Sequence, residues 1–136
     1  MAGLLLAVWL VGGLLLTLLP AQLDPGRQAE PNFVPFKTIG IYLASLDSSY
    51  WFGQMVGNLL LLVPLGLLGP IVFPWMDRWW RVLVASLLLG AAIEVAQLWI
   101  PDRSADVDDL LLNVVGATLG YAILSVVRIG SRTATA

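Results

Sequence analysis

A few strongly polar side chains, embedded in long apolar runs, are the residues of this sequence that could do chemistry. Glu94 and Gln97 stand inside one apolar run, and Asn58 and Asn113 stand inside two others. Such residues are costly in an apolar segment, and in membrane helices they usually face a partner, a cavity or the bundle interior. A carboxylate can act as a general acid or base, and an amide can hydrogen-bond a polar ligand.

A second polar group lies in the segment 101–109, which holds four acids and one arginine. Arg103 could bind an anionic head group or stabilise developing negative charge. Asp106 and Asp109 have the spacing of a helix N-terminal cap, which is one explanation for them. Asp109 and Asn113 share one face of a helix, which capping does not explain.

Several kinds of chemistry are excluded by composition. The 136 residues contain no Cys and no His, so thiol nucleophiles, disulfides and imidazole ligands are absent. Asp102, Ser104, Asp106 and Asp108 alternate as in a calcium loop, but Val107 replaces its glycine and Asn113 its final glutamate. We therefore predict no metal site and no cofactor, with looser divalent binding at the acids as the alternative. Seven scattered basic residues and a net charge of -2 make no nucleic-acid surface.

The elements that must position these residues are membrane helices. Hydrophobic residues make up 59% of the chain and charged residues 12%, with a mean hydropathy of +0.88. A soluble domain of this size has too little interior to bury so much apolar surface. We predict an all-α integral membrane four-helix bundle over residues 1–128, with a short tail at 129–136. Its spans are about residues 2–20, 53–73, 80–100 and 110–127.

Local patterns refine this outline. No basic residue precedes the first apolar run, which favours a retained span over the alternative of a cleaved signal peptide. Pro64 predicts a kink in the second span. Phe36, Ile39 and Leu43 recur at helical spacing, so we predict a short helix over 36–47 at the membrane surface. A solvated connector is the alternative for that segment.

Depth and charge place the polar residues near one membrane face. At 1.5 Å per residue, Asn58, Glu94, Gln97 and Asn113 lie within roughly 10 Å of the face that borders segment 101–109. Four Lys or Arg residues lie on the side of both termini and three on the other side. The positive-inside rule then puts the termini in the cytoplasm and the polar layer near the outer face of the plasma membrane.

Several motifs together resemble the VanZ-like family. They are Asn32–Phe36 (NFVPF), Asn58–Gly66 (NLLLLVPLG), Glu94–Gln97 (EVAQ) and Arg103–Gly116 (RSADVDDLLLNVVG). The resemblance covers roughly residues 4–127. One departure is conservative: Leu and Val stand where the family often has Phe between the Asn and Pro of the second span. The resemblance implies a small bacterial membrane protein. Name-giving members are associated with low-level resistance to teicoplanin, a glycopeptide that carries a lipid tail.

Three hypotheses follow for the polar layer. In the first, it binds an amphiphile, such as a membrane lipid, a lipid-tailed antibiotic or a lipid-linked precursor, through Arg103 and other polar residues. Those residues are Asn58, Glu94, Gln97, Asp106, Asp109 and Asn113. In the second, Glu94 or Asp109 is a general base that acts on a lipid ester or phosphate. In the third, the protein is a membrane adaptor whose polar layer only fixes helix packing.

Overall fold

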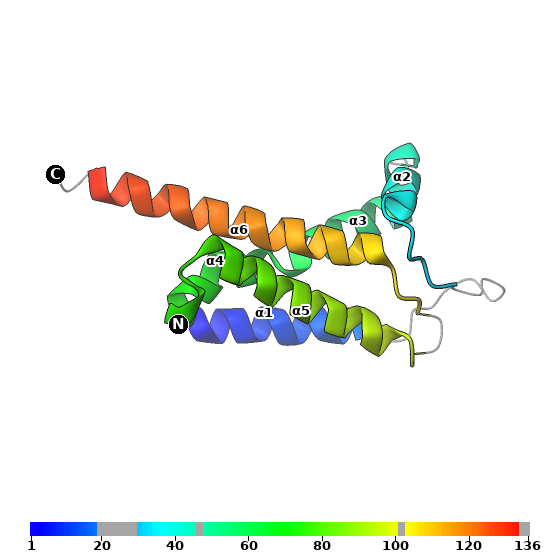
Figure 1. The fold of residues 1–136 in the computed structure, drawn as a ribbon, viewed down its shortest axis with the longest axis horizontal. Helices are drawn as coiled ribbons and strands as arrows, with labels where there is room; N and C mark the ends of the chain where they lie inside the picture. The colour runs from blue at the N-terminus through cyan, green and yellow to red at the C-terminus, as the bar shows by residue number, and fades with distance from the viewer. Residues whose placement is uncertain (19–29, 46–47, 101–102, 134–136) are drawn as a thin grey trace.

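Seven helical segments follow one another within the described residues, which contain no β-strand (Figure 1). The computed structural model describes residues 1–18, 30–45, 48–100 and 103–133. The segments are α1 (Ala2–Leu18), α2 (Lys37–Ala44), α3 (Ser49–Leu61), α4 (Val63–Val72), the 3₁₀ helix η1 (Pro74–Met76), α5 (Trp79–Gln97) and α6 (Val107–Thr133). The predicted all-α class is confirmed.

Within the described residues, three stretches of helix are long and apolar enough to cross a membrane. They are Ser49–Val72, Trp79–Gln97 and Val107–Ser131. They correspond to the second, third and fourth predicted spans, although α6 runs on past the predicted end at 127. The described part of α1 carries no charge but has 17 residues, fewer than the roughly 20 that a span needs. The predicted end of that span, at 19–20, lies outside the described residues.

These helices expose most of their apolar surface. In the most apolar window of each long stretch, only 28% to 33% of the residues are buried inside the protein. Large side chains such as Leu88 and Val126 point outward. Exposing apolar surface to water costs roughly 25 cal/mol per Å². The outward faces are therefore suited to lipid, and the chain is a membrane protein.

The second span is broken next to Pro64. Leu62 leaves helical geometry, with φ −104° and ψ 5°, between the end of α3 and the start of α4. A proline inside a helix lacks an N–H group and crowds the carbonyl four residues earlier. The kink predicted from Pro64 is thus present. The Trp9 indole of α1 donates to the Leu61 carbonyl at 3.0 Å, so α1 docks at the break.

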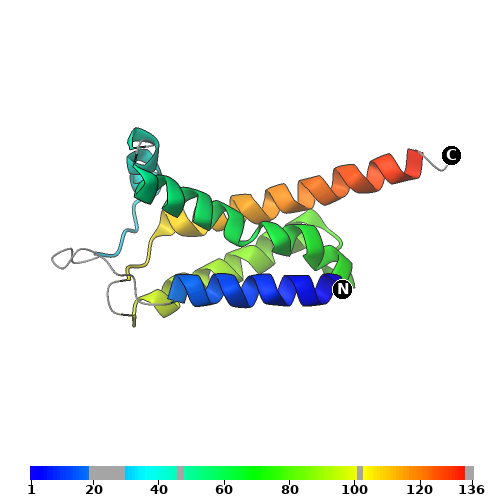
Figure 2. The same cartoon turned by 180° about the vertical axis from the view of Figure 1, so that it is seen from behind.

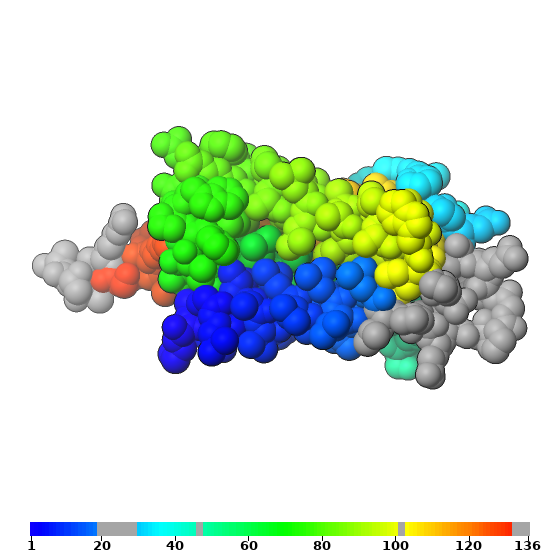
Figure 3. All heavy atoms as spheres, turned by 90° about the horizontal axis from the view of Figure 1, so that it is seen from below, coloured from blue at the N-terminus to red at the C-terminus, as the bar shows by residue number. Residues whose placement is uncertain are grey.

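α6 is the helix against which α3, α4 and α5 all pack. The approach is close because glycines face neighbouring backbones. A Cβ atom at Gly116 would overlap the Leu59 carbonyl, and one at Gly120 would overlap the Val63 carbonyl. Small residues permit this kind of contact between membrane helices. α1 packs on α4 and α5, alongside which it lies on the face shown in Figure 3.

Both termini lie at one end of the molecule, and the polar loops lie at the other (Figures 1 and 2). We call the end with the polar loops the loop end. It carries residues 30–45, 98–100 and 103–109. There α2 contacts α3 and the start of α6. The helix predicted over 36–47 spans Lys37–Ala44, and residues 46–47 lie outside the described part of the chain.

Candidate functional site

Asp106 caps α6 and joins it to a distant segment. Its Oδ1 accepts the backbone N–H of Asp108 at 2.9 Å, which is the bond that an N-cap aspartate makes. The same carboxylate accepts the Asn32 amide at 2.9 Å and the Thr38 hydroxyl at 2.6 Å. The capping explanation for Asp106 is therefore confirmed. Asp106 also holds the connection between α1 and α3, called the first loop, against α6.

Glu94 binds the start of α6 from another helix. It is 8% exposed, and its Oε2 accepts the backbone N–H of Asp106 at 2.6 Å. In a capping box, that N–H is bonded by a side chain three residues into the same helix. Here a carboxylate of α5 takes that place and ties α5 to α6. Among the described residues, Arg103 does not pair with Glu94, because its guanidinium reaches α1.

Asp108 holds the start of α2. Its side chain is fully buried, and it accepts three backbone N–H groups of the first loop. The bonds run from Phe36 at 2.6 Å, Thr38 at 2.7 Å and Ile39 at 3.0 Å. N–H groups at a helix start have no partner within the helix, and their partial positive charge favours a carboxylate. Asp108 was absent from the predicted site, and its contacts assign it a structural role.

Asp109 faces α2 and α3. Its Oδ1 accepts the hydroxyl of Tyr42 at 3.2 Å. Burial raises the pKa of Tyr42 above its ordinary value, and the nearby Asp109 charge raises it further, so the phenol stays protonated and donates. Asn58 of α3 lies beside Asp109. Its Nδ2 is buried and has no hydrogen-bond partner in the described part of the chain.

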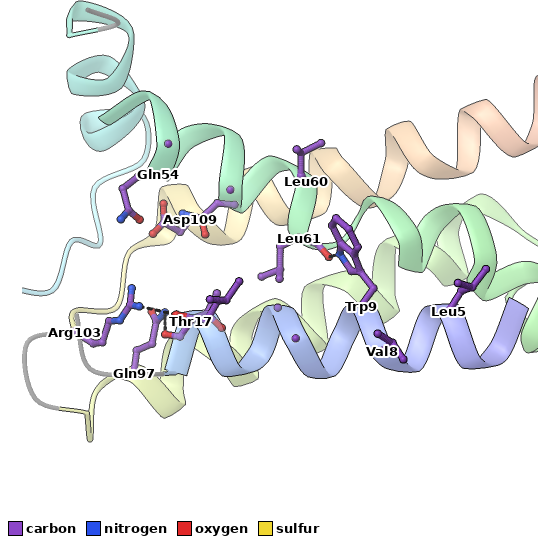
Figure 4. Close-up of a pocket in the computed structure, with 16 residues that line it drawn as sticks. Leu5, Val8, Trp9, Thr17, Gln54, Leu60, Leu61, Gln97, Arg103 and Asp109 are labelled. Atoms are coloured by element: carbon purple, nitrogen blue, oxygen red, sulfur yellow. Dashed lines mark hydrogen bonds between the residues drawn. The ribbon is translucent and has the colours of Figure 1, made fainter. Parts of the chain in front are cut away.

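Gln97 and Arg103 converge on the last turn of α1. The Gln97 amide donates to the Thr17 carbonyl at 3.3 Å, and Arg103 Nη2 donates to the Leu16 carbonyl at 2.8 Å (Figure 4). The last carbonyls of a helix lack intrahelical partners and carry partial negative charge. These two side chains therefore bind α1 to the loop end.

A cavity of about 620 Å³ lies between α1 and α3 (Figure 4). The two helices meet where Trp9 contacts Leu61, and they diverge toward the loop end (Figures 2 and 4). Polar side chains line the cavity at the loop end: Thr17, Gln54, Asn58, Gln97, Arg103 and Asp109. Apolar side chains line the rest, among them Leu5, Val8, Trp9, Leu60 and Leu61. The volume lies within the roughly 300–1,000 Å³ typical of small-molecule sites.

Glycines on both helices leave this space open. Gly12 and Gly13 of α1 and Gly53 and Gly57 of α3 line the cavity. A Cβ atom added at Gly12, Gly53 or Gly57 would meet nothing within 4 Å. Side chains at these positions would therefore occupy the cavity.

Four of the predicted site residues reach the cavity, and three do not. Asn58, Gln97, Arg103 and Asp109 line it, whereas Glu94, Asp106 and Asn113 do not. No group of three carboxylates or other metal-ligating side chains gathers within the described residues. Asp102, one member of the calcium-like alternation, lies outside them.

Asn113 faces α5 instead. It is fully buried, and its Nδ2 lies 3.9 Å from the position of a Cβ built on Gly90. Neither its Nδ2 nor its Oδ1 has a hydrogen-bond partner in the described parts of the chain. The shared helical face expected for Asp109 and Asn113 therefore does not bring both residues to one site.

Three cavity residues were not among the predicted site residues. Trp9 and Thr17 belong to α1, and Gln54 belongs to α3. Gln54 lies one helical turn before Asn58, which was a usable signal. Trp9 was also detectable, because an indole N–H inside an apolar span needs an acceptor.

Comparison with known proteins supplies one match. No curated protein and no solved structure matches the chain. A family model described as VanZ/LLP1 matches residues 3–128, which is nearly the whole chain and includes every residue of the cavity lining. The chain therefore belongs to the VanZ/LLP1 family.

Proposed function

We propose that this membrane protein binds an amphiphile in the cavity between α1 and α3. The observation that carries the proposal is the division of the cavity lining into a polar part at the loop end and an apolar part beyond it. An amphiphile matches such a lining, with its head group at the loop end and its chain between the two helices. Binding places each half in its preferred surroundings.

The polar part supports a head group that accepts hydrogen bonds. Arg103 lines this part, and guanidinium recognises phosphate and carboxylate groups. Asn58 lines the same part beside Asp109, and its amide nitrogen can donate to a phosphate or carboxylate oxygen of a ligand. Asp109, next to Tyr42, can accept a hydroxyl or amine from the same head group.

The apolar part supports a single chain. Its walls are α1 and α3. The glycines of these helices widen the cavity, and Leu5 and Val8 extend its lining toward the N-terminus of α1. One acyl or alkyl chain can lie there.

We further propose that α1 is a fourth span and that the termini are cytoplasmic. The packing of α1 on α4 and α5 supports a helix that belongs to the bundle. The two termini share one end of the molecule, as an even number of spans requires (Figure 1). With the four-to-three Lys/Arg count, the loop end and its cavity face the outside of a bacterial plasma membrane.

A cavity-filling variant tests the binding proposal. The probe is hexadecyl phosphate, whose binding to the purified protein in detergent is followed by native mass spectrometry. Gly57→Leu adds a side chain to the cavity lining at a position where a Cβ meets nothing within 4 Å, and Gly130→Leu adds the same side chain to α6 away from the cavity. We expect Gly57→Leu to weaken binding about tenfold or more and Gly130→Leu to leave it unchanged. Equal binding by both variants would refute the proposed site.

Head-group recognition is tested with a second pair of variants. Arg103→Gln removes the cation at the cavity, and Arg78→Gln removes one at the opposite end of α5. We expect only Arg103→Gln to weaken hexadecyl phosphate binding, and neither to affect uncharged hexadecanol. If Arg103→Gln weakens both probes equally, Arg103 acts on the shape of the cavity and not on the head group.

The proposed ligand class includes lipid-tailed antibiotics, so a role in resistance belongs to the same proposal. Expression in a susceptible host is expected to raise the inhibitory concentration of teicoplanin but not that of a glycopeptide without a lipid tail. Gly57→Leu is expected to abolish the increase. An equal increase for both antibiotics would contradict recognition of the tail.

Catalysis on a lipid ester or phosphate is the second candidate, and the position of Asp109 favours it. Asp109 lines the cavity together with Arg103, whereas Glu94 does not line it and is bonded to the Asp106 N–H. Asp109 would then be the general base that activates water. Asp109→Asn is expected to stop release of inorganic phosphate from hexadecyl phosphate while binding persists. If wild type neither binds nor hydrolyses the probes, the adaptor hypothesis is favoured.

A further inference from the structure

An exposed apolar stretch precedes α2 at the loop end. Phe33, Val34 and Phe36 are 71%, 60% and 70% exposed, and Pro35 among them is exposed as well. Isolated apolar residues are common on protein surfaces, but a contiguous exposed group of large ones marks an interaction surface.

The backbone of this stretch is held firmly by the rest of the fold. Asn32 pairs with the chain before α6, through Asn32 N–H to Ala105 O at 2.9 Å and Val107 N–H to Asn32 O at 3.0 Å. At the other end, the Phe36 N–H donates to Asp108 at 2.6 Å. The backbone bonds at both ends hold this segment in place. Its apolar side chains therefore remain exposed and do not fold back onto the protein.

The backbone conformation of Phe36 shows that surrounding contacts constrain this segment. Its φ is 66°, in the left-handed region that is unfavourable for a bulky residue. Strain of this kind persists only where surrounding interactions impose it, and it is concentrated at functional positions. The bond to Asp108 supplies part of that constraint.

Exposed apolar side chains continue into α2. Ile41 and Leu43 are exposed on either flank of the helix, and Tyr42 between them is buried against the protein. Lys37 is exposed at the start of the helix. A helix that exposes large apolar side chains together with a lysine is suited to the membrane interface.

Aromatic residues of the neighbouring helices mark the same level of the molecule. Tyr50 and Phe52 are exposed at the start of α3, and Trp99 is exposed just after α5. Aromatic side chains gather at membrane–water boundaries. The exposed stretch therefore lies at the level where the apolar α3–α4 span begins, and α2, which follows the stretch, contacts α3 directly.

We propose that residues 33–36 and the exposed apolar side chains of α2, Ile41 and Leu43, together called the lipid wedge, insert into the interfacial region of the bilayer, with Lys37 directed at anionic lipid phosphates. The occupant of this surface is the lipid that surrounds α3. None of the lipid-wedge residues lines the cavity. The proposal for the lipid wedge can therefore be tested independently of ligand binding in the cavity.

The absence of native cysteine allows a direct test. Single cysteines replace Phe33, Val34 or Leu43, and each variant is spin-labelled and reconstituted in vesicles of phosphatidylcholine and phosphatidylglycerol. Paramagnetic relaxation by oxygen, which partitions into lipid, is compared with relaxation by a water-soluble nickel chelate. Val126→Cys on the outward face of α6 is the lipid control, and Glu30→Cys in the first loop is the water control.

We expect the three lipid-wedge labels to resemble the Val126 label, with high oxygen and low nickel accessibility. Labels that resemble the Glu30 label would show that the stretch lies in water. Labels shielded from both reagents would show that protein covers the surface. Either of these results would overturn the proposal.

A second variant separates insertion from mere proximity to the membrane. The double substitution Phe33→Asn and Phe36→Asn removes both rings, and asparagine adopts the left-handed conformation readily. We expect the oxygen-to-nickel ratio at a Leu43 label to fall about twofold because the lipid wedge becomes shallower. An unchanged Leu43 ratio, with the Val126 label and the thermal midpoint also unchanged, would refute a role of these rings in insertion.

Discussion

The buried acids at the loop end bind backbone N–H groups of other segments. Asp108 accepts three from the first loop, and Glu94 accepts one from Asp106. A carboxylate removed from water costs several kcal/mol unless hydrogen bonds compensate the lost hydration. These side chains therefore have two effects: they anchor the first loop, and they satisfy donors that the starts of α2 and α6 leave unpaired.

Asp108→Asn tests the anchoring role. Asparagine keeps the size of the side chain but turns an NH₂ group toward an N–H donor, so at least one of the three bonds is lost. We expect the free energy of unfolding in detergent to fall by about 3 kcal/mol, since each hydrogen bond to a charged group contributes roughly 1.5–3 kcal/mol.

The control for this substitution is Asp77→Asn, at the other end of the molecule. Asp77 forms an exposed i,i+4 ion pair with Arg81 at 3.0 Å. Exposed pairs contribute roughly 0–1 kcal/mol. We expect little change in the control, and equal losses for both variants would contradict the anchoring role of Asp108.

Asn113 presents the opposite situation, because its buried amide has no partner in the described structure. We expect Asn113→Val to raise the free energy of unfolding by about 1 kcal/mol, because the desolvation cost of an unpaired amide is removed. Asn113→Asp is expected to destabilise the protein strongly, because it buries a charge at the same position. A less stable Asn113→Val variant would mean that the amide has a partner, such as a bound water or a ligand.

At the scale of the helices, backbone contact organises the bundle. Gly116 and Gly120 let α6 touch the carbonyls of α3 and α4, and Gly66 presents α4 to α6 in the same way. These contacts hold α6 on both sides of the break at Leu62. The spacing of Gly116 and Gly120, four residues apart, is typical of close packing between membrane helices.

Gly116→Ala tests this packing. Its Cβ would overlap the Leu59 carbonyl, so the helices must separate. We expect a loss of at least about 2 kcal/mol in unfolding free energy, by comparison with overpacked cores. Gly130→Ala, in the same helix with nothing within 4 Å, is the matched control. It is expected to be neutral or stabilising by up to about 1 kcal/mol, because alanine favours helix. Similar losses in both variants would contradict the packing role.

The helices themselves could be predicted from sequence more fully than the candidate site. Apolar length predicted the helices, and Pro64 predicted the break. The cavity depends on the divergence of α1 from α3, and no residue pattern within either helix specifies that angle. The bond from Arg103 to the Leu16 carbonyl could not be predicted either, because a side-chain pattern does not show which backbone carbonyls lie nearby. Residues 32–39 and 106–108 meet only through the tertiary fold.

At the scale of the whole molecule, the two ends differ in chemistry. The loop end holds the anchoring acids, the polar part of the cavity and the lipid wedge. The other end holds both termini and η1 (Figure 1). A protein with this asymmetry meets different chemistry on the two sides of a membrane. The orientation of the protein in the membrane therefore decides whether the proposed ligand reaches the cavity from the outer or the inner leaflet.

Single-cysteine labelling of intact cells tests this orientation, and the lack of native cysteine makes each signal unambiguous. Ser104→Cys reports on the loop end, and Asp77→Cys reports on the segment between η1 and α5. We expect an impermeant thiol reagent to label position 104 in intact cells and position 77 only after permeabilisation. The reverse pattern would place the cavity at the cytoplasmic face and would make the inner leaflet the source of the ligand. Labelling of both positions from outside would contradict a bundle whose two ends lie on opposite sides of the membrane.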